Sequence, residues 1–337
     1  MRVFSVNDWE PLMEVIVGRA DFAYIPPPDP SMKNFMFANL SYREISKLIG
    51  SYSDKVISEA NQDLEDLSDK LKELGVKVYR PKKVRHDAQI VTPYWKTTGW
   101  HNYCPRDIFL VIGTSIVEVP SVMRSRIFET WSYNEILHEA FAGGAKWFSA
   151  PKQMYNDSSF NFDDLSKPTL MNNEILFDAP NVVRLGMNLL YQVSNSGNEK
   201  GAEWLQSMFP EYKVIVEHDA YSGAHFDSTV VPLREGLVLF NGHRVSPDNY
   251  PKIFEKWDKI FFKDFFGSQS ESSGISSDAI GMNLLSVTDD LVIVDENQSE
   301  LMKTLLDYDI HSIPMSMRHQ RTLGGGFHCV TLDLKRG

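Results

Sequence analysis

Strand-like and helix-like segments alternate along the whole chain, and this order limits the fold more than any other feature of the sequence. Between 53 and 74 the apolar residues recur every three or four positions and stop at Gly75, which predicts a helix. Runs typical of strands lie on either side of it, at 12–18 and 76–81. The start of the chain therefore reads as strand, helix, strand.

The same mixture recurs in the rest of the chain. Further helices are predicted at 131–142, 182–191 and 302–306. The remaining predicted strands are 108–112, 116–119, 214–216, 230–231, 237–240, 284–287, 291–294 and 310–313. Repeated hairpin, helix and strand units favour an α/β or α+β architecture built from similar modules, although no internal sequence repeat is visible. No linker rich in Gly or Ser divides the 337 residues, so we expect a single domain, 1–337.

Charge and cysteine content narrow the class of partner and the compartment. The formal net charge is −11 and no basic run occurs. Nucleic acid and anionic membranes both require a positive surface, so we expect small-molecule ligands instead. Cys104 and Cys329 are the only cysteines, too few for a disulfide framework, and no stretch is apolar enough for a signal peptide or a membrane helix. These features predict a cytoplasmic protein.

A glycine-rich stretch near the C-terminus, LGGGFHC at 323–329, is the first candidate for catalysis. Glycines permit positive φ and close approach of the backbone, and Cys329 then opens an apolar run predicted to be a strand. Alone, this cysteine is more simply a small buried residue. His225 changes that, because a cysteine with a distant histidine and a carboxylate is the usual set of a thiolate enzyme. His328 is expected to pack behind the site, since neighbouring residues on a strand face opposite ways.

Three aspartates, Asp107, Asp178 and Asp227, stand beside strand-like runs. Each alone is also explained by turn formation or capping, Asp178 most simply as a cap. Asp227 follows His225 by two positions, so both point to one side if the segment is extended. Carboxylates next to a thiol and an imidazole suit a planar cation, because paired carboxylates grip a guanidinium through two-pronged hydrogen bonds.

The chain resembles the amidinotransferase family over nearly its whole length. The motifs that carry the resemblance are WEPLMEVIVG at 9–18, PRDI at 105–108, RSRIFE at 124–129, GAKW at 144–147, FDA at 177–179, HFDST at 225–229, MN at 282–283 and GGGFHC at 324–329. The resemblance implies the pentein fold, a five-bladed α/β-propeller of ββαβ modules around a central active-site channel.

The same resemblance implies roles for seven residues. Cys329 would be the nucleophile, His225 the acid and base, and Asp178 the carboxylate that orients His225. The other four would bind substrate, the guanidinium between Asp107 and Asp227 and the amino-acid carboxylate at Arg244 and Ser277. No metal or organic cofactor is implied, and His86 and His101 lack the spacing of metal ligands.

The implied reaction moves the amidino group of L-arginine through a covalent amidino-cysteine to a small primary amine, with glycine as the first guess, and releases ornithine. One histidine serves both half-reactions, which implies ping-pong kinetics. A homodimer is a further expectation, which the sequence does not decide.

Several alternatives are also compatible with these residues. A hydrolase of the same fold, of the arginine deiminase or dimethylargininase type, would use water in place of the amine, and a binding protein would keep the pocket without turnover. An inosamine phosphate is another candidate acceptor. Ala224 replaces the Met of the glycine enzyme, which leaves room for a larger acceptor. The run 269–274 is either a lid or a plain surface loop.

Overall fold

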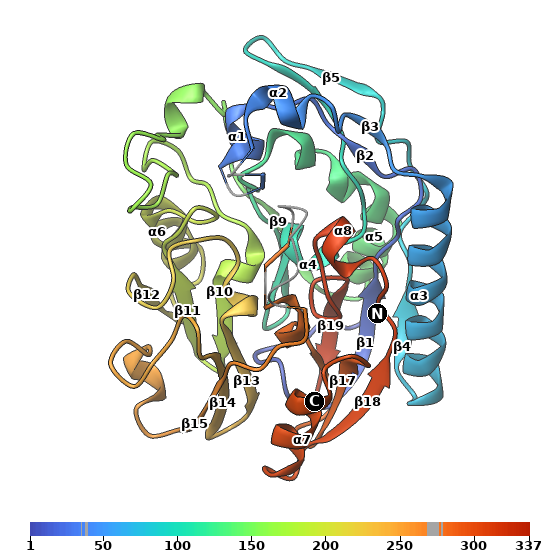
Figure 1. Ribbon diagram of the computed structural model, residues 1–337, viewed down its shortest axis with the longest axis vertical. Coiled ribbons are helices and arrows are strands. Elements are labelled where there is room, and N and C mark those ends of the chain that lie inside the picture. Colours follow the sequence, from blue (N-terminus) through green and yellow to red (C-terminus); the bar gives the residue numbers. More distant parts are fainter. Residues whose placement is uncertain (35, 38–39, 268–275, 278) are drawn as a thin grey trace.

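The computed structural model describes residues 1–34, 36–37, 40–267, 276–277 and 279–337, and its strands include five three-stranded sheets of one topology (Figure 1). In each sheet one neighbour of the middle strand is antiparallel to it and the other is parallel. The sheets are β19 (Thr331–Arg336), β1 (Leu12–Val17) and β4 (Lys77–Tyr79); β7 (Phe109–Ile112), β8 (Ser115–Glu118) and β9 (Lys146–Ser149); β10 (Val182–Leu185), β11 (Asn188–Gln192) and β12 (Lys213–Glu217); β13 (Val230–Arg234), β14 (Leu237–Asn241) and β15 (Asp258–Phe262); and β16 (Leu285–Ser286), β17 (Leu291–Asp295) and β18 (His311–Met315).

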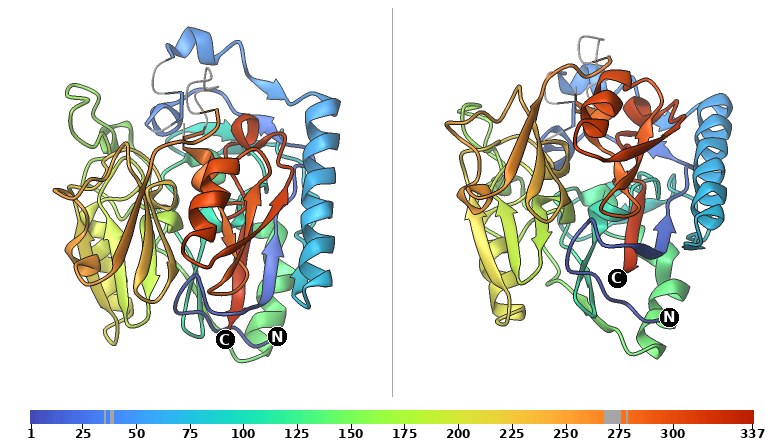
Figure 2. Two further views of the ribbon diagram at one scale, coloured as in Figure 1. Left: turned by 60° about the horizontal axis from the view of Figure 1, so that its bottom comes forward. Right: turned by 90° about the horizontal axis from the view of Figure 1, so that it is seen from below.

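A crossover joins the two parallel strands of each module, as parallel pairing requires. It contains α3 (Asp54–Glu73), α5 (Asn134–Ala142), α6 (Glu199–Met208) or α7 (Ser299–Leu306) in four modules, and a 3₁₀ turn at Lys252–Phe254 in the module of β13 to β15. This is the predicted pentein arrangement of ββαβ modules (Figure 2). The shorter elements are β2 (Tyr24–Ile25), α1 (Pro30–Lys33), α2 (Tyr42–Ile45), β3 (Gly50–Ser51), β5 (Gln89–Val91), β6 (Lys96–Thr98), α4 (Pro105–Ile108) and α8 (Gln320–Leu323).

The two ends of the chain close the ring of modules. β19 pairs antiparallel with β1, with Val15 opposite Asp333 and Ile16 opposite Leu332. One module is thus built from both termini, and the turn before β19 is fixed against the first strand of the chain. This closure places the glycine-rich motif among residues that come much earlier in the sequence.

The helix predicted at 53–74 is confirmed as α3. The Ser53 side chain accepts a hydrogen bond from the backbone of Val56 at 3.3 Å, an N-cap that starts the helix. Ala60, Leu64 and Leu71 lie on its buried face, in the same cluster as β1. The helix therefore covers this sheet from outside (Figure 1). Among the described residues, none of the helices combines the length and apolar character needed to cross a bilayer.

The helix predicted at 182–191 is wrong, because this segment is the hairpin of β10 and β11. The strands turn at Gly186, whose φ is +67°, and Val183 pairs with Leu190. Val182 and Val183, which face opposite sides, are both buried. A strand buried on both faces shows no apolar and polar alternation, so its pattern cannot be told from a buried helix.

Candidate active site

A cavity of about 250 Å³ opens where loops of several modules meet. Five of the predicted site residues line it, namely Asp107, His225, Asp227, Ser277 and Cys329. Three neighbours, Arg126, Ile280 and Asn283, line it as well. The cavity thus collects side chains from widely separated parts of the chain.

Cys329 lies in the turn between α8 and β19, two residues before the strand that it was predicted to open. Gly324 ends α8 with a φ of +80°, and a Cβ on Gly325 would lie 2.5 Å from Cys104 Sγ and 2.9 Å from Cys329 Cβ. These two glycines let the chain turn tightly against the thiol. Asn283 Oδ1 accepts from the backbone N–H of Cys329 at 2.9 Å.

The thiol of Cys329 is buried beside a carboxylate and a second thiol. It donates to Asp227 Oδ2 at 3.4 Å. A hydrogen bond with Cys104, burial and the charge of Asp227 raise the pKa of Cys329 well above its usual range, and a hydrogen bond with His225 opposes them. Without a bound cation, this thiol is therefore protonated at neutral pH.

His225 is held between two carboxylates. Its Nε2–H donates to Asp178 Oδ2 at 2.9 Å, and Nδ1 lies 3.7 Å from Asp107 Oδ1. Burial alone would lower the pKa of His225, but the charge of Asp107 and the hydrogen bond with Asp178 outweigh it, so the pKa is raised well above its usual range. His225 does not lie in an extended segment, the condition under which it and Asp227 would share one face; its φ is +37°, and it precedes a 3₁₀ turn at Phe226–Ser228.

Asp178 orients the imidazole and is not a helix cap. It precedes the 3₁₀ turn Ala179–Asn181, but its side chain makes no capping hydrogen bond there. Oδ1 instead accepts from the backbone N–H of Val122 at 3.2 Å, and Oδ2 accepts from His225. With both oxygens engaged and the residue fully buried, the carboxylate fixes the direction of the ring.

Asp107 and Asp227 each present one oxygen that accepts no hydrogen bond from the described residues. Asp107 Oδ2 accepts from Arg126 Nη1 at 2.7 Å, and Asp227 Oδ2 accepts from Asn283 Nδ2 at 2.9 Å. Oδ1 of either aspartate is buried and has no hydrogen-bond partner among the described residues. Buried carboxylate oxygens are normally satisfied, so these two atoms mark a place for a ligand that donates N–H groups.

Arg244 and Ser277 meet at another part of the wall. Arg244 Nη2 donates to Ser277 Oγ at 2.8 Å, and Nη1 donates to Thr229 Oγ1 at 2.8 Å. The guanidinium carbon lies 3.9 Å from the centre of the Tyr221 ring, so stacking also fixes the side chain. All seven predicted site residues are thus brought to one region. The run 269–274 lies outside the described residues.

Four further residues contact the site, and no role in it was predicted for any of them from the sequence. Arg126 and Asn283 hold the two aspartates; both lie in motifs of the family resemblance, where a role could have been sought. Cys104 is a buried thiol that contacts Cys329. His328 lies behind the cavity as predicted, but for another reason, because it is in a turn and its ring contacts Asp227.

Comparison with known proteins decides the family, although no family model matches the chain. Inosamine-phosphate amidinotransferase 1 of Streptomyces glaucescens is 42% identical over 343 aligned positions, which cover 100% of this chain and 97% of the relative. The chain belongs to the amidinotransferase family. This amidinotransferase is also 33% identical to L-arginine:L-lysine amidinotransferase of Pseudomonas savastanoi pv. phaseolicola, over 99% of the chain and 94% of the relative. Mitochondrial glycine amidinotransferase of Gallus gallus is 32% identical, over 99% of this chain and 83% of the relative.

Solved structures agree with this assignment. The amidinotransferase superposes on inosamine-phosphate amidinotransferase from Streptomyces griseus with a TM-score of 0.95 and 42% identity, over 99% of this chain and 97% of the other. DDAH from Pseudomonas aeruginosa is only 12% identical, with a TM-score of 0.60 over 96% of this chain and 99% of the other, and shares the fold alone. The protein is therefore an enzyme that transfers amidino groups.

Proposed function

We propose that this enzyme, acting as a single domain of residues 1–337, moves the amidino group of L-arginine to a primary amine through an amidino adduct on Cys329. The observation that carries the proposal is the pair of unfilled buried oxygens, Oδ1 of Asp107 and Oδ1 of Asp227, in the cavity that contains the thiol. A guanidinium offers planar N–H donors to both and neutralises the carboxylates.

Binding of the cation prepares the thiol for attack. The charge of Asp227 raises the pKa of the thiol in the free enzyme, and a guanidinium held by the two aspartates opposes this effect. The thiolate then forms a bond to the guanidinium carbon. Imidazolium His225 gives its proton to Nε of the bound arginine, the bond between Nε and the guanidinium carbon breaks, and ornithine leaves as a neutral amine. The amidino-thioether keeps the positive charge between the aspartates.

The second half-reaction reverses these steps with another amine. Neutral His225 takes a proton from the incoming amine as it attacks the amidino carbon. The C–S bond then breaks, which restores the thiolate and the imidazolium. Asp178 keeps the ring in the same orientation for both transfers, because its hydrogen bond occupies the other ring nitrogen.

Arg244 and Ser277 form the proposed site for the carboxylate of the amino acid. The arginine supplies a planar cation, and its contacts with Ser277, Thr229 and Tyr221 fix its orientation before substrate binds. A preorganised fork of this kind suits a carboxylate better than a flexible ammonium would. Binding both ends of arginine at once places the guanidinium carbon at the thiol.

For the acceptor we propose an inosamine phosphate, an amine on a cyclitol ring. The relatives named for this acceptor are 42% and 43% identical to the chain, whereas the relative named for glycine is 32% identical. The first guess of glycine thus has support only from more distant relatives. Ala224 lines the cavity beside His225, and this small side chain leaves space for a ring. A homodimer and a cytoplasmic location stay predictions.

Mass spectrometry after an acid quench tests the covalent step. Wild-type protein mixed with guanidino-labelled arginine, without acceptor, should carry one amidino group on Cys329 and release one equivalent of ornithine. Cys104→Ala should still form the adduct, and Cys329→Ala should not. Absence of an adduct from the wild type would contradict the proposal, and steady formation of citrulline would identify a hydrolase.

An acceptor screen tests the second half-reaction. Inosamine phosphate, glycine and L-lysine are each added to the isolated amidino-enzyme, and the decay of the adduct is followed. We expect fastest decay with the inosamine phosphate. Faster decay with glycine would overturn the proposed acceptor and leave the covalent step standing.

A further inference from the structure

We propose that His328, the residue before the nucleophile, is a positioning residue that holds Asp227 so that Oδ1 faces the guanidinium of the substrate. This inference rests on the proposed function, in which the guanidinium of arginine binds Oδ1 of Asp227. The sequence alone placed His328 behind the site without a task.

Three donors converge on one oxygen of Asp227. Oδ2 contacts His328 Nδ1 at 2.8 Å, Asn283 Nδ2 at 2.9 Å and Cys329 Sγ at 3.4 Å. An ionised carboxylate only accepts, so Nδ1 of His328 carries the proton of this bond. The hydrogen bond from His328 lowers the pKa of Asp227 against the opposing effect of burial. Saturation of Oδ2 stops the carboxylate from rotating and leaves Oδ1 for the substrate.

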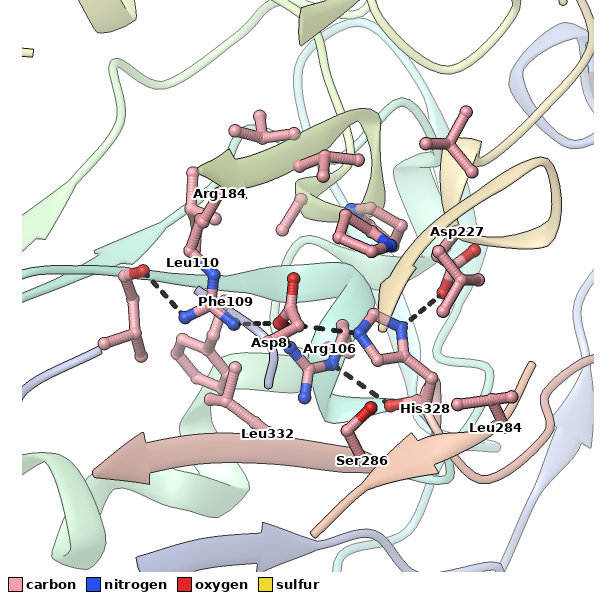
Figure 3. A pocket seen from close by; sticks show the side chains of 18 residues that line it. Asp8, Arg106, Phe109, Leu110, Arg184, Asp227, Leu284, Ser286, His328 and Leu332 are labelled. Atoms are coloured by element: carbon pink, nitrogen blue, oxygen red, sulfur yellow. Dashed lines mark hydrogen bonds and ion pairs between the residues drawn. The ribbon is translucent and has the colours of Figure 1, made fainter. Parts of the chain in front are cut away.

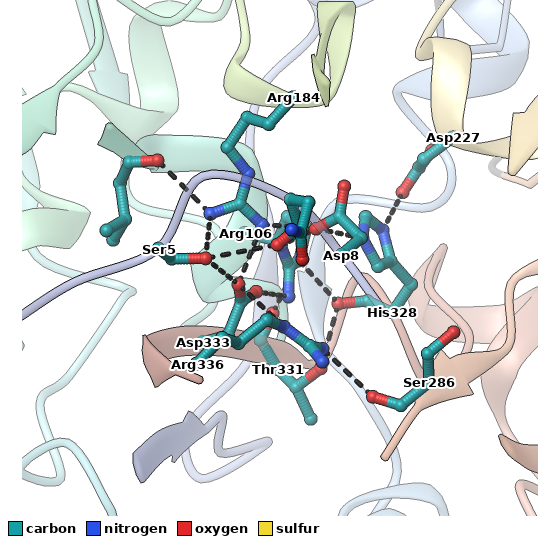
Figure 4. Close-up of polar contacts among 12 residues, drawn as sticks. Ser5, Asp8, Arg106, Arg184, Asp227, Ser286, His328, Thr331, Asp333 and Arg336 are labelled. Carbon is teal, nitrogen blue, oxygen red and sulfur yellow. Dashed lines mark hydrogen bonds and ion pairs between the residues drawn. The ribbon is translucent and has the colours of Figure 1, made fainter. Parts of the chain in front are cut away.

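The other edge of the imidazole ring faces a second carboxylate, away from the cavity. Nε2 lies 3.8 Å from Asp8 Oδ1, and the same oxygen contacts Arg184 and lies 3.4 Å from Arg106 Nη1. Figure 3 shows the ring between the two aspartates, and Figure 4 shows that Asp8 joins a wider polar cluster. The ring thus connects the substrate-facing carboxylate to a fixed group behind it.

The backbone of His328 is fixed as well. Its N–H donates to the carbonyl of Asn283 at 3.3 Å, and its own carbonyl accepts from Arg106 Nε at 3.1 Å. Asn283 also accepts from the N–H of Cys329 at 2.9 Å. The same turn therefore positions the thiol of Cys329 and the imidazole of His328, which holds Asp227. A shift of this turn would displace both side chains.

His328 does not serve as a second base. It is absent from the residues that line the substrate cavity in the described part of the chain; it lines a smaller cavity of about 30 Å³ behind Asp227, with Asp8 and Arg184. Nδ1 is committed to Asp227 and Nε2 faces Asp8, so neither nitrogen reaches the reacting atoms.

Arginine binding to histidine variants tests the positioning role. In a Cys329→Ala background, which stops turnover, His328→Leu should weaken arginine binding by roughly tenfold to a hundredfold, the range for losing a hydrogen bond to a charged group. His328→Asn should restore most of the affinity, because its amide N–H lies where Nδ1–H does. The matched control is His319→Leu, which breaks a histidine–carboxylate pair with Glu59 at 2.8 Å outside both cavities.

The outcomes separate positioning from a general effect on folding. Wild-type affinity in His328→Leu would overturn the proposal, as would an Asn variant as weak as the Leu variant. Equal losses in His319→Leu and His328→Leu, with equally lowered Tm, would also overturn it.

A measurement on unsubstituted His328 covers the case in which the Leu variant does not fold. In ¹⁵N NMR of the histidine rings, Nδ1 of His328 should carry a proton and its signal should shift when arginine binds. An unprotonated Nδ1 would contradict the role. The protonation of Nδ1 is measured without substrate. Failure to form the arginine adduct would therefore contradict the proposed function, whereas an unprotonated Nδ1 would contradict only the role of His328.

Discussion

Cys329 Sγ donates to Asp227 Oδ2 over 3.4 Å, although the two residues are 102 positions apart in the chain. A thiol in this position is stabilised in its protonated form, because ionisation would place two negative charges side by side. The proposed nucleophile is therefore protonated until a cation binds, and arginine, the proposed substrate, is itself a cation. This relationship sets the first prediction.

The rate of the first half-reaction should rise with pH on the acid side. Both the Cys329 thiol and His225 have raised pKa values in the free enzyme, so both carry protons at neutral pH, whereas attack needs thiolate with imidazolium. One proton must leave. Log kcat/KM for arginine should climb about one unit per pH unit, level off, and fall once His225 loses its proton. A profile that is flat from roughly pH 6 to 10 would contradict this assignment of protons.

His225→Asn should keep arginine binding and lose transfer. The two aspartates proposed to hold the guanidinium remain, but no group protonates the leaving amine, so adduct formation should slow by roughly 10²- to 10⁴-fold. Rapid-quench mass spectrometry gives the rate, and calorimetry in a Cys329→Ala background gives the affinity. Asp178→Asn should show a smaller loss of rate. Unchanged adduct formation in His225→Asn would remove His225 from the mechanism.

Arg244→Ala should raise KM for arginine more than it lowers kcat. The residue is proposed to bind the carboxylate of arginine, which does not react, so its loss removes binding common to ground and transition states. We expect a rise of roughly tenfold or more, as for a charged hydrogen bond. Lys213→Ala, at an exposed position on β12, is the charge-matched control. A loss confined to kcat would argue for a role nearer the chemistry.

Gly325→Ala should displace the thiol. The new Cβ would lie 2.5 Å from Cys104 Sγ and 2.9 Å from Cys329 Cβ, closer than side-chain atoms approach, which typically costs about 1–3 kcal/mol. We expect slower adduct formation together with a lower Tm. The double variant Cys104→Ala/Gly325→Ala removes the nearer atom and should recover part of both. If neither the rate of adduct formation nor the Tm recovers, the contact with Cys104 is not the source of the strain.

Asp333→Asn should strongly destabilise the fold. Asp333 Oδ2 lies 2.7 Å from Arg184 and 3.1 Å from Arg336, Oδ1 contacts Arg106, and the carboxylate is fully buried (Figure 4). Its loss leaves buried Arg336 without its counter-ion and leaves Arg106 and Arg184 with Asp8 alone, at a cost of about 3–5 kcal/mol. Chemical denaturation measures the change, and Asp164→Asn, at an exposed pair, is the control. A change no larger than in the control would show that the cluster relaxes without cost.

Local sequence patterns predicted much of the secondary structure and the set of candidate site residues. The spacing of apolar residues predicted α3 and the hairpin of β7 and β8, since both depend on neighbours a few positions apart. Motif order indicated the family and the seven candidate residues. The prediction was wrong for β10 and β11, because strands buried on both faces show no alternation of apolar and polar residues. The strand assumed at His328 was also wrong, because this residue lies in a turn.

Only the tertiary structure decided how these residues meet. The pairing of β19 with β1 closes the ring of modules, and this closure presses the turn of Cys329 against Asp227, Asn283 and Cys104. No spacing in the sequence encodes which oxygen of Asp227 accepts hydrogen bonds and which has no such partner among the described residues. That choice depends on contacts between distant segments, and such contacts form only when the whole chain has packed.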